Sequence, residues 1–355
     1  MIEPFIYNGQ PARVIFGAGR LADLGAEIDR LGGKRAILIV TPRQKAFAED
    51  IAGQLDGRVA GIFAEAEMHT PVAVTERAMA LVGEARADLA VAIGGGSTVG
   101  LSKAIALRTR LPQIVVPTTY AGSEMTPILG ETKDGVKTTQ SSPEILPEVV
   151  IYDVALTLSL PPKLAVTSGM NAIAHSVEAL YARERNPIIS LMAEESIRAI
   201  GRALPGIVAA PGDRGPRSDA LYGAWLAGSC LGSVGMSLHH KLCHTLGGTF
   251  GLPHAETHTI VLPHATAYNA AAAPEAMRRI AGALGASDAA DGLYDLARSL
   301  GAQMGLRDLG MPEEGIDRAA ELAVKNPYWN PRAIEPAAVR GLIARAWAGA
   351  RPIED

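Results

Sequence analysis

The sequence predicts an α/β domain at residues 1–157 and an all-helical domain at residues 158–355. Three observations support this prediction. Short runs of β-branched apolar residues alternate with helical patterns up to about residue 155. Beyond residue 160 these runs stop, and Ala, Leu, Glu and Arg recur at helical spacing. A glycine-rich turn follows one of the apolar runs, where a strand is expected to lead into a helix.

The predicted strands of the first domain are apolar runs with helical stretches between them. Helical patterns near residues 43–55 and 97–107 each follow such a run. Continuous apolar strands separated by helices are typical of a parallel sheet that helices cover on both faces. The four clearest runs are residues 36–40, 88–93, 113–116 and 149–152.

The second domain is expected to contain helices only. Glycine and proline interrupt its helical patterns near residues 205–215, at residues 310–312 and near residues 327–331. Because these residue types end helices, we interpret the three positions as connections between helices. The link between the two domains is predicted near residues 157–162.

Composition excludes several classes of function. A net charge of −4, with 20% charged residues, indicates neither a nucleic-acid surface nor an acidic tail. No run approaches roughly eighteen uninterrupted apolar residues, so we expect no membrane span. The N-terminal sequence lacks a basic segment followed by an apolar core, so we expect no signal peptide. Two cysteines, Cys230 and Cys243, are too few for a disulfide framework, which favours a reducing cytoplasm.

Two glycine motifs are candidates for binding a nucleotide phosphate. The first, Gly17-Ala18-Gly19-Arg20-Leu21-Ala22, follows Val14-Ile15-Phe16 and fits the dinucleotide fingerprint G-x-G-x-x-A. That fingerprint also requires an acidic residue after the second strand, which would hold the ribose hydroxyls. This strand ends in Val40-Thr41-Pro42-Arg43, without a carboxylate. A simple turn before a helix is therefore the preferred interpretation of the first motif.

The second motif, Gly94-Gly95-Gly96-Ser97, lies between a predicted buried strand and a helix. Three glycines let the backbone approach a pyrophosphate, and the helix N-terminus supplies N–H groups and positive potential. Pro117-Thr118-Thr119 closes the next strand at the same sheet edge, where ligands of doubly wound sheets bind. We therefore predict a nucleotide-binding site, rather than a purely structural turn, at Gly94, Gly95, Gly96, Ser97, Thr118 and Thr119.

Polar residues concentrate in two segments of the helical domain. Asn171 and His175 are four residues apart, as are His240 and His244, and residues at this spacing share one helix face. Structural helices rarely concentrate imidazoles, because burial requires partners for both ring nitrogens. We therefore interpret the cluster as a site for a small cation or a polar substrate. Residues 239–254 hold four of the chain's eight histidines: His239, His240, His244 and His254.

Two further residues of this domain have less certain roles from sequence. Glu178, three residues beyond His175, is either an orienting partner for a histidine or a surface carboxylate. His264 follows Pro263, as His254 follows Pro253, in an otherwise apolar region.

Together these motifs resemble the iron-containing alcohol dehydrogenase superfamily. The resemblance rests on Gly94-Gly95-Gly96-Ser97, Pro117-Thr118-Thr119 and residues 169–178 and 240–254, and it covers nearly the whole chain. It implies an α/β N-terminal nucleotide-binding domain and an all-α C-terminal domain, with the site in the cleft between them. It also implies NAD(P) on Gly94-Gly95-Gly96-Ser97 and Thr118-Thr119, a homodimer, and a mere turn for the first glycine motif.

Departures from the superfamily's pattern are informative. Metal-dependent members carry Asp at the position of Asn171, and their three histidine ligands match His175, His240 and His254. Asn is a neutral and weak ligand, so its presence makes a divalent cation harder to hold. We therefore expect no bound metal.

These departures resemble the maleylacetate reductase branch of the superfamily. Gly100 stands where other members have Asp, and residues 119–125 shorten their Thr-Ala-Gly-Thr-Gly-Ser-Glu motif. The branch implies NAD(P)H-dependent reduction of the carbon–carbon double bond of maleylacetate, a small dicarboxylate, to 3-oxoadipate during the breakdown of aromatic compounds. The other matching segments are residues 170–175, 239–244, 254–258 and 326–331.

The implied reaction suggests roles for the polar residues. Hydride addition to a conjugated double bond places negative charge on an enolate oxygen, which hydrogen-bond donors stabilise. Among the candidates, His240 and His244 are expected to serve the enolate and the proton, and Tyr328 is a weaker acid candidate. Lys241 and Arg332 are possible carboxylate anchors, although a solvated surface role explains them equally well. The full expected set is Asn171, His175, His240, His244, His254 and Tyr328.

The end of the second strand bears on the choice of nucleotide. Strict NAD users of the superfamily often carry Asp there, whereas this chain has Pro42 and Arg43. Loss of the carboxylate removes repulsion against a 2′-phosphate, and Arg43 could pair with that phosphate. We therefore expect both NADH and NADPH to be accepted.

Two other functions stay open. A metal-dependent alcohol or polyol dehydrogenase of the same superfamily would use Asn171 as a ligand, and bound zinc or iron with chelator sensitivity would indicate it. A carbon–oxygen lyase of the dehydroquinate synthase type would retain and regenerate NAD. Stoichiometric consumption of NADH would exclude the lyase.

Overall fold

The computed structural model describes residues 5–7, 9–10, 12–133, 136–325 and 328–354. It divides the chain into two compact units, Gly9–Leu160 and Pro161–Asp355, and residues 5–7 group with the second. The junction lies three residues beyond the boundary expected from the sequence. Within the described part of the chain, no helix has the length and apolarity needed to cross a membrane.

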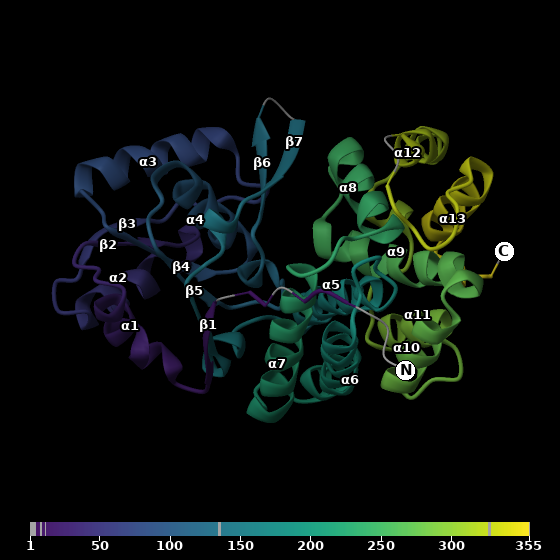
Figure 1. Cartoon of the computed structure of the whole chain (residues 1–355), viewed down its shortest axis with the longest axis horizontal. Helices are drawn as coiled ribbons and strands as arrows, with labels where there is room; N and C mark the ends of the chain where they lie inside the picture. Colours follow the sequence, from purple (N-terminus) through teal and green to yellow (C-terminus); the bar gives the residue numbers. More distant parts are fainter. Residues whose placement is uncertain (1–4, 8, 11, 134–135, 326–327, 355) are drawn as a thin grey trace. The chain divides into compact units, whose positions relative to one another are not determined.

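The first unit is built on a six-stranded sheet in the order β1-β8-β5-β4-β2-β3 (Figure 1). Its strand pairs are all parallel. This confirms the predicted parallel α/β architecture. The strands are β1 (Arg13–Gly17), β2 (Ala36–Ile39), β3 (Val59–Phe63), β4 (Leu89–Gly94), β5 (Gln113–Pro117) and β8 (Val149–Asp153). The helices are α1 (Leu24–Arg30), α2 (Lys45–Gln54), α3 (Val72–Ala85) and α4 (Gly96–Thr109).

Helices cover both faces of this sheet, as Figure 1 shows. One face buries Ile28 of α1 and Ile51 of α2 against the strands. The opposite face buries Val74 of α3 and Ile105 of α4. Because successive side chains of a strand point to opposite faces, a sheet covered on both sides requires the uninterrupted apolar runs seen in the sequence.

A two-stranded antiparallel hairpin lies outside the six-stranded sheet. It consists of β6 (Ile128–Lys133) and β7 (Val136–Ser141). The sequence analysis did not predict it, because β7 is polar and lacks the apolar run on which the strand predictions relied.

The second unit is helical, and its described residues contain no strand, as predicted. Pro205 lies inside α6, so the predicted interruption near residues 205–215 begins only after Ala209. The helices are α5 (Pro162–Leu180), α6 (Pro187–Ala209), α7 (Arg214–Leu231), α8 (Leu238–Phe250), α9 (His254–Asn269), α10 (Pro274–Leu284), α11 (Ala289–Ser299), α12 (Gly315–Val324) and α13 (Pro336–Ala348).

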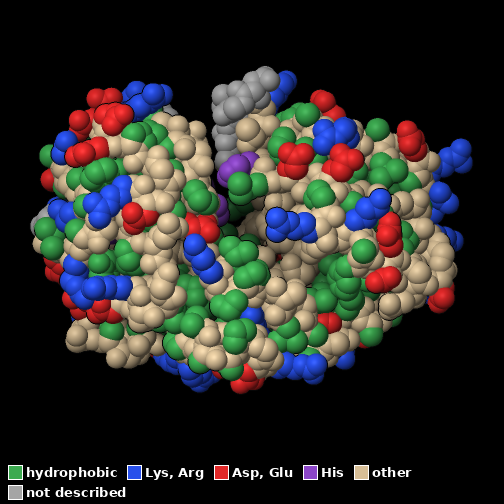
Figure 2. All heavy atoms as spheres, turned by 180° about the vertical axis from the view of Figure 1, so that it is seen from behind, with side chains coloured by type: hydrophobic (Ala, Val, Ile, Leu, Met, Phe, Trp, Pro, Cys, Tyr) green, Lys and Arg blue, Asp and Glu red, His purple; other side chains and the backbone are tan. Residues whose placement is uncertain are grey.

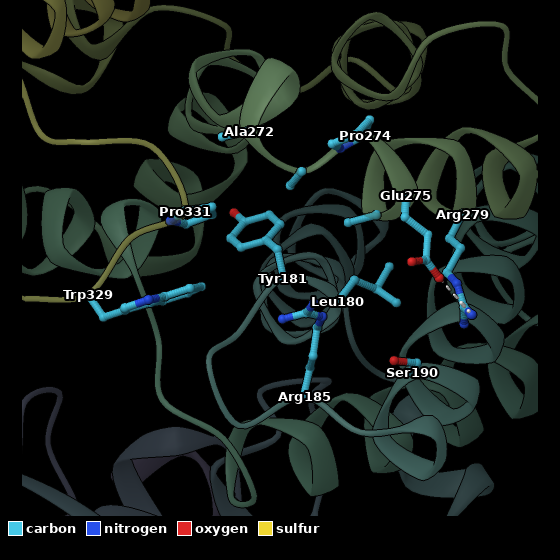
Figure 3. Close-up of a pocket in the computed structure, with 12 residues that line it drawn as sticks. Leu180, Tyr181, Arg185, Ser190, Ala272, Pro274, Glu275, Arg279, Trp329 and Pro331 are labelled. Atoms are coloured by element: carbon cyan, nitrogen blue, oxygen red, sulfur yellow. Dashed lines mark ion pairs between the residues drawn. The ribbon is translucent and has the colours of Figure 1, made fainter. Parts of the chain in front are cut away.

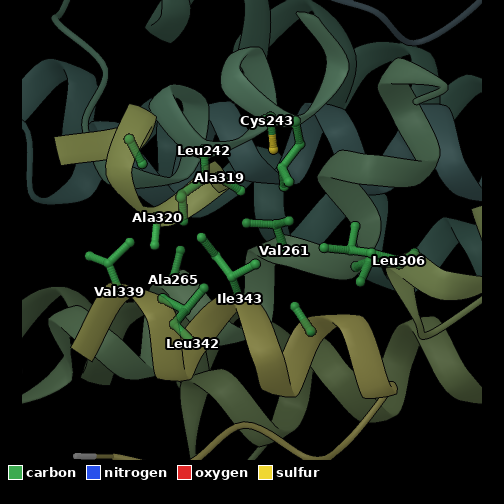
Figure 4. Packing of buried hydrophobic residues seen from close by; sticks show 14 of the residues in the cluster. Leu242, Cys243, Val261, Ala265, Leu306, Ala319, Ala320, Val339, Leu342 and Ile343 are labelled. Carbon is green, nitrogen blue, oxygen red and sulfur yellow. The ribbon is translucent and has the colours of Figure 1, made fainter. Parts of the chain in front are cut away.

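An apolar cluster fixes α8 and α9 in this unit. Leu242 of α8 and Val261 of α9 pack with Ala320 of α12 and with Leu342 and Ile343 of α13 (Figure 4). All five side chains are buried. Burial of a Leu, Ile or Val side chain contributes roughly 1.5–3 kcal/mol, so this cluster holds the two helices that carry most of the histidines.

Candidate active site

The turn after β4 has the form of a phosphate cradle. Gly94 has a φ of 149°, and a Cβ there would lie 2.8 Å from Oγ1 of Thr98, so only glycine fits. No side chain caps the N-terminus of α4, where Gly95 is the N-cap. A Cβ on Gly96 would have no neighbour within 4 Å. Uncapped N–H groups beside open space fit the pyrophosphate of a dinucleotide.

The other predicted nucleotide residues lie beside this turn. The N–H of Thr118 donates to the carbonyl of Gly94 at 3.0 Å, and Thr119 packs against Gly95. The short 3-10 helix Pro42–Gln44 follows β2, and Oε1 of Gln44 would lie 3.0 Å from a Cβ on Gly94. The crossovers from β2 and β4 run in opposite directions across the sheet, which marks the switch point where α/β sheets bind ligands. The structure therefore brings the exposed Arg43 to this edge.

The first glycine motif has an internal partner instead of a phosphate. The N–H groups of Gly19 and Leu21 donate to the carboxylate of Asp153 at 2.9 and 2.8 Å. Because a carboxylate already occupies these donors, the motif acts as a turn between β1 and the following helix.

Gly100 lies where the structure leaves no room for a side chain. A Cβ at this position would collide with the hydroxyl of Thr70, which is buried. Thr70 thus fills the space that a longer side chain would need.

Three helices of the second unit bring the polar residues together. α5 contributes Asn171, His175 and Glu178, α8 contributes His239, His240 and His244, and α9 contributes His254 and His258. Most of them are buried, but His244 is exposed and His254 is half-buried. We call these eight residues the histidine cluster.

Glu178 is buried and organises one side of the histidine cluster. Its carboxylate accepts hydrogen bonds from the backbone N–H groups of Ser237 and His239, at 2.9 and 2.8 Å. It also lies 2.7 Å from Nδ1 of His240. Ser237 does not cap α8 with its own side chain, so Glu178 of α5 serves as the cap. The orienting role considered for Glu178 is therefore the one its contacts support.

A series of hydrogen bonds continues from Glu178. Nε2 of His240 lies 2.8 Å from Nδ1 of His175, and Nε2 of His175 lies 3.4 Å from Nδ2 of Asn171. We call Glu178, His240, His175 and Asn171 the relay.

The chemistry of Glu178 sets the direction of the relay. An ionised carboxylate only accepts hydrogen bonds, so His240 must carry its proton on Nδ1. Nε2 of a neutral His240 then accepts from His175, whose Nε2 accepts in turn from the amide of Asn171. A second proton on His240 would reverse the first bond, and the amide of Asn171 would then have to turn its Oδ1 toward His175, because Nδ2 cannot accept. The direction in which hydrogen bonds are donated along the relay therefore depends on whether His240 carries one proton or two.

His258 lies at the centre of the histidine cluster. Its ring centroid is 4.3 Å from that of His254, 4.7 Å from His239 and 5.0 Å from His240. Its Nδ1 lies 2.9 Å from Nε2 of His239. Burial, then the neighbouring histidines, lowers the pKa values of His239 and His258 well below the usual range, so both are neutral at pH 7.

His244 and His254 form the accessible edge of the histidine cluster. Their rings stack with a 19° angle and a centroid distance of 6.5 Å. The ring of His244 also meets that of His240 edge-on, at 6.3 Å. A ligand would therefore reach this pair before the buried histidines.

Tyr328 and Lys241 are neighbours, with Nζ of Lys241 5.6 Å from the centroid of the Tyr328 ring. Desolvation, followed by the charge of Glu178, raises the pKa of Tyr328. At neutral pH its hydroxyl is therefore a hydrogen-bond donor and a poor source of protons. Asn326 and Pro327 begin the segment 326–331 that was matched in the sequence analysis, and they lie outside the described residues.

Arg332 contacts the C-terminal part of α9, and His264 lies within that part of the helix. The guanidinium of Arg332 stacks on Tyr268 at 4.3 Å and donates to its carbonyl. Tyr268 is fourteen residues beyond His254 on α9, about 21 Å along the helix. His264 is ten residues beyond His254, about 15 Å along the same helix.

The residues that match the ligands of metal-dependent members do not fit a divalent cation as they stand. Two nitrogens bound to one tetrahedral zinc would be about 3.3 Å apart, given Zn–N bonds near 2.0–2.1 Å. Nδ1 of His175 and Nε2 of His240 are 2.8 Å apart, the distance of a hydrogen bond. Asn171 supplies no charge, and its Oδ1 has no hydrogen-bond partner in the described part of the chain.

A second group of possible ligands consists of His239, Cys243 and His258. Their donor atoms all lie within 4.8 Å of one another, and all three residues are buried. Metal-bound histidines usually donate their outer N–H to a partner. Among the described residues, Nδ1 of His239 and Nε2 of His258 have none. Burial also raises the pKa of Cys243, which keeps the thiol protonated while no metal is bound. The contacts therefore describe a hydrogen-bonded pair of imidazoles better than a metal centre.

The sequence analysis included His258 only as the end of the matching segment 254–258, and it gave neither His258 nor His239 a role. The available signal was spacing, since His258 lies four residues beyond His254 and shares its helix face. The central position of His258 depends on the packing of α9 against α5 and α8, which spacing does not report.

Comparisons with known proteins agree with the α/β first unit and the helical second unit. The family model described as iron-containing alcohol dehydrogenase matches residues 11–154. The model described as the C-terminal part of the Fe-containing alcohol dehydrogenase family matches residues 165–347.

Similar proteins extend over almost the whole chain. A maleylacetate reductase of Rhizobium sp. strain MTP-10005 is 56% identical over 351 residues, which are 99% of this chain and 100% of the relative. The crystal structure of a putative alcohol dehydrogenase from Ralstonia eutropha JMP134 has a TM-score of 0.98 at 57% identity and covers 99% of each chain. That of maleylacetate reductase from Agrobacterium tumefaciens has a TM-score of 0.96 at 57% identity and covers 99% of this chain and all of the other.

Proposed function

Because the chain belongs to the iron-containing alcohol dehydrogenase family, we propose that it acts as a maleylacetate reductase, the activity for which its Rhizobium and Agrobacterium relatives are named. The reaction adds hydride and a proton across the carbon–carbon double bond of maleylacetate and gives 3-oxoadipate, a step in the breakdown of aromatic compounds. The relay favours this reductase over a metal-dependent alcohol dehydrogenase of the same family. The residues that match the ligands of metal-dependent members are joined here by hydrogen bonds.

NADH or NADPH supplies the hydride when it is bound. Gly94, Gly95, Gly96 and Ser97 would hold its pyrophosphate through the uncapped N-terminus of α4. Thr118 and Thr119 follow the neighbouring strand, and they would contact the same nucleotide beside its pyrophosphate. Pro42 and Arg43 would face the ribose, where Arg43 could pair with a 2′-phosphate.

Hydride addition to the carbon β to the ketone leaves negative charge on the enolate oxygen. The stacked pair His244 and His254 is accessible, which supports a role for these rings as hydrogen-bond donors to the enolate or to a substrate carboxylate. We assign the proton that reaches the α-carbon to His244, because it is the exposed imidazole. His240 lies behind it and is oriented by Glu178.

The relay supports this chemistry without touching the substrate. Glu178 fixes the ring orientation and tautomer of His240, in the way that a carboxylate orients a catalytic imidazole. Positive charge that develops on the His240 ring is stabilised by the buried carboxylate behind it. Asn171, at the other end of the relay, stays neutral and adds no charge that would oppose a dicarboxylate substrate.

The proposal has three further parts: the enzyme needs no metal, it forms a homodimer in the cytoplasm, and it uses both NADH and NADPH. The absence of a carboxylate at Asn171 supports the first. Size-exclusion chromatography with light scattering tests the second, and the third is tested through Arg43.

The decisive experiment follows NADH oxidation with maleylacetate, with and without a chelator, beside simple aldehydes. We expect chelator-resistant turnover of maleylacetate, with one NADH consumed for each 3-oxoadipate formed. Activity on aldehydes alone, abolished by the chelator, would establish the metal-dependent alcohol dehydrogenase instead. Stoichiometric consumption of NADH would also exclude the lyase.

A further inference from the structure

The helical unit contains a cavity of about 330 Å³ whose described lining residues include no buried charge (Figure 3). Of its two arginines, Arg185 is exposed, and Arg279 pairs with Glu275 at 3.2 Å, the contact dashed in the figure. Basic and acidic side chains are mixed over the face seen in Figure 2, without a large patch of one sign. Neither feature indicates a ligand, whereas the hydroxyl of Thr70 in the first unit does.

Thr70 lies in the connection between β3 and α3 and has a strained backbone. Its φ is 47°, and the φ of His69 before it is 65°. Positive φ is unfavourable for a residue with a side chain, and most of all for a β-branched one. Arg86 and Arg110 also have positive φ, but each is the C-cap of a helix, where this conformation is common. Strain outside such positions gathers at functional sites, so the surroundings of the Thr70 side chain are informative.

Strand β6 holds this connection through its backbone. The N–H of Thr132 donates to the carbonyl of Thr70 at 3.2 Å, and the hydroxyl of Thr132 donates to the carbonyl of His69 at 3.1 Å. The N–H of Thr70 donates to the carbonyl of Glu67 at 3.4 Å. The hydroxyl of Thr70 takes part in none of these bonds, and it has no hydrogen-bond partner among the described residues. It is therefore not needed to hold the connection.

The Thr70 hydroxyl is directed at helix α4. The residue is only 4% exposed, and the part that remains exposed includes the hydroxyl oxygen. This oxygen would lie 2.3 Å from a Cβ on Gly100, nearer than any other atom. A polar group on a buried residue without a partner in the protein indicates a partner from outside, such as a ligand.

Gly96 and Gly100 form a bare strip on α4, and the Thr70 hydroxyl lies at one end of it. The two glycines are four residues apart, so they share one face and are about 6 Å apart along the helix. At the other end, a Cβ on Gly96 would have no neighbour within 4 Å, so the space there is open. Gly96 is the first residue of α4, where the nucleotide pyrophosphate would bind. A sugar attached to that pyrophosphate can follow the strip to Thr70.

We propose that the hydroxyl of Thr70 binds the ribose next to the nicotinamide. A hydroxyl both donates and accepts hydrogen bonds, so threonine and a ribose hydroxyl match without a charge on either. Arg43 is proposed to face the other ribose, on the adenosine side, which leaves the nicotinamide ribose for the strip on α4. This inference rests on the proposed nucleotide site, and it gives the strained connection a function.

Nucleotide binding to the intact protein, measured by titration calorimetry, tests the proposal with NADH, ADP-ribose and ADP. Only the first two probes carry the second ribose. Thr70→Val removes the hydroxyl and keeps the branched shape of the side chain. We expect it to weaken NADH and ADP-ribose about three- to tenfold, the effect of one hydrogen bond, and to leave ADP unchanged. The urea midpoint of unfolding should stay that of the wild type, because no hydrogen bond within the protein is lost.

Three further variants separate the hydroxyl from the rest of the connection. Thr70→Ser keeps a hydroxyl and should retain most of the affinity for NADH. Gly100→Ala places a methyl group against the hydroxyl and should weaken NADH as Thr70→Val does. Thr109→Val is the matched control, since it makes the same substitution at the far end of α4, where the hydroxyl donates to the carbonyl of Ile105. It should leave the affinity for all three probes unchanged.

Two results would overturn this inference alone. Equal affinity for NADH in Thr70→Val and the wild type would show that the hydroxyl does not touch the nucleotide. An equal loss of affinity for ADP would place the contact on the adenosine half. Failure of the wild type to bind any of the three probes would reject the proposed nucleotide site itself, and this inference with it.

Discussion

The carboxylate of Glu178 on α5 and Nδ1 of His240 on α8 are joined by a buried hydrogen bond of 2.7 Å. Through this contact a single residue caps one helix and sets the tautomer of an imidazole on it. The orientation of the proposed catalytic residues and the packing of two helices therefore depend on the same carboxylate.

Glu178→Gln should lower kcat about ten- to hundredfold with little change in KM for maleylacetate, because three donors converge on two carboxylate oxygens and glutamine keeps only one oxygen. The unsatisfied donor should also cost about 1–3 kcal/mol of unfolding free energy. Glu184→Gln is the control, since Glu184 accepts from Gly235 in the loop before α8 but meets no imidazole. Steady-state kinetics and urea unfolding measure both effects. Equal kcat values in the two variants would show that Glu178 is only structural.

Asn171→Asp should create affinity for zinc or ferrous iron, because the change places a carboxylate beside His175. We expect about one metal ion per chain after dialysis against the metal, measured by elemental analysis, and none in the wild type. Asn171→Ala should remain free of metal. Stoichiometric metal in the wild type would contradict the assignment of Asn171 as the end of a hydrogen-bonded relay.

Arg43→Ala should raise KM for NADPH at least tenfold and leave KM for NADH unchanged, because a charge-assisted contact to the 2′-phosphate is worth roughly 1.5–3 kcal/mol. Lys45→Ala, two residues away and also exposed, is the control. Initial rates with both nucleotides provide the measurement. If the wild type rejects NADPH and Arg43→Ala changes nothing, the predicted dual use is wrong.

Stability should fall as pH decreases from about 6.5 to about 4, and His264 should account for part of the loss. Burial, followed by the charge of Arg345, lowers the pKa of His264 to about 4, whereas the unfolded chain takes up this proton near pH 6.5. The unfolded state therefore binds more protons in this window, and stability decreases with falling pH. For His264 alone the loss at pH 5 is about 2 kcal/mol.

His264→Gln tests this contribution, because glutamine does not titrate. Urea unfolding at pH 7.5 and pH 5 should show a smaller loss of stability in the variant than in the wild type, by about 2 kcal/mol. An identical pH dependence in both proteins would assign the acid sensitivity to other groups, with the neutral pair His239 and His258 as the next candidates.

The candidate site was only partly predictable from sequence. The four-residue spacing of Asn171 and His175 correctly predicted a shared helix face, because helical periodicity is local. The turn at Gly94 was equally local. The central position of His258 was not predictable, because its distances to His239 and His240 depend on how α9 packs against α8.

The sequence by itself determined the parallel sheet, the helical second unit and the side chains available for chemistry, because strand and helix patterns depend on neighbours along the chain. Only the tertiary structure decided which polar groups meet. Asp153 occupies the N–H of Gly19, 134 residues away, and Glu178 occupies the N–H of His239, 61 residues away. Each pairing satisfies backbone donors that would otherwise be left without partners. Local patterns show which groups need a partner, and packing between distant elements determines which residue supplies it.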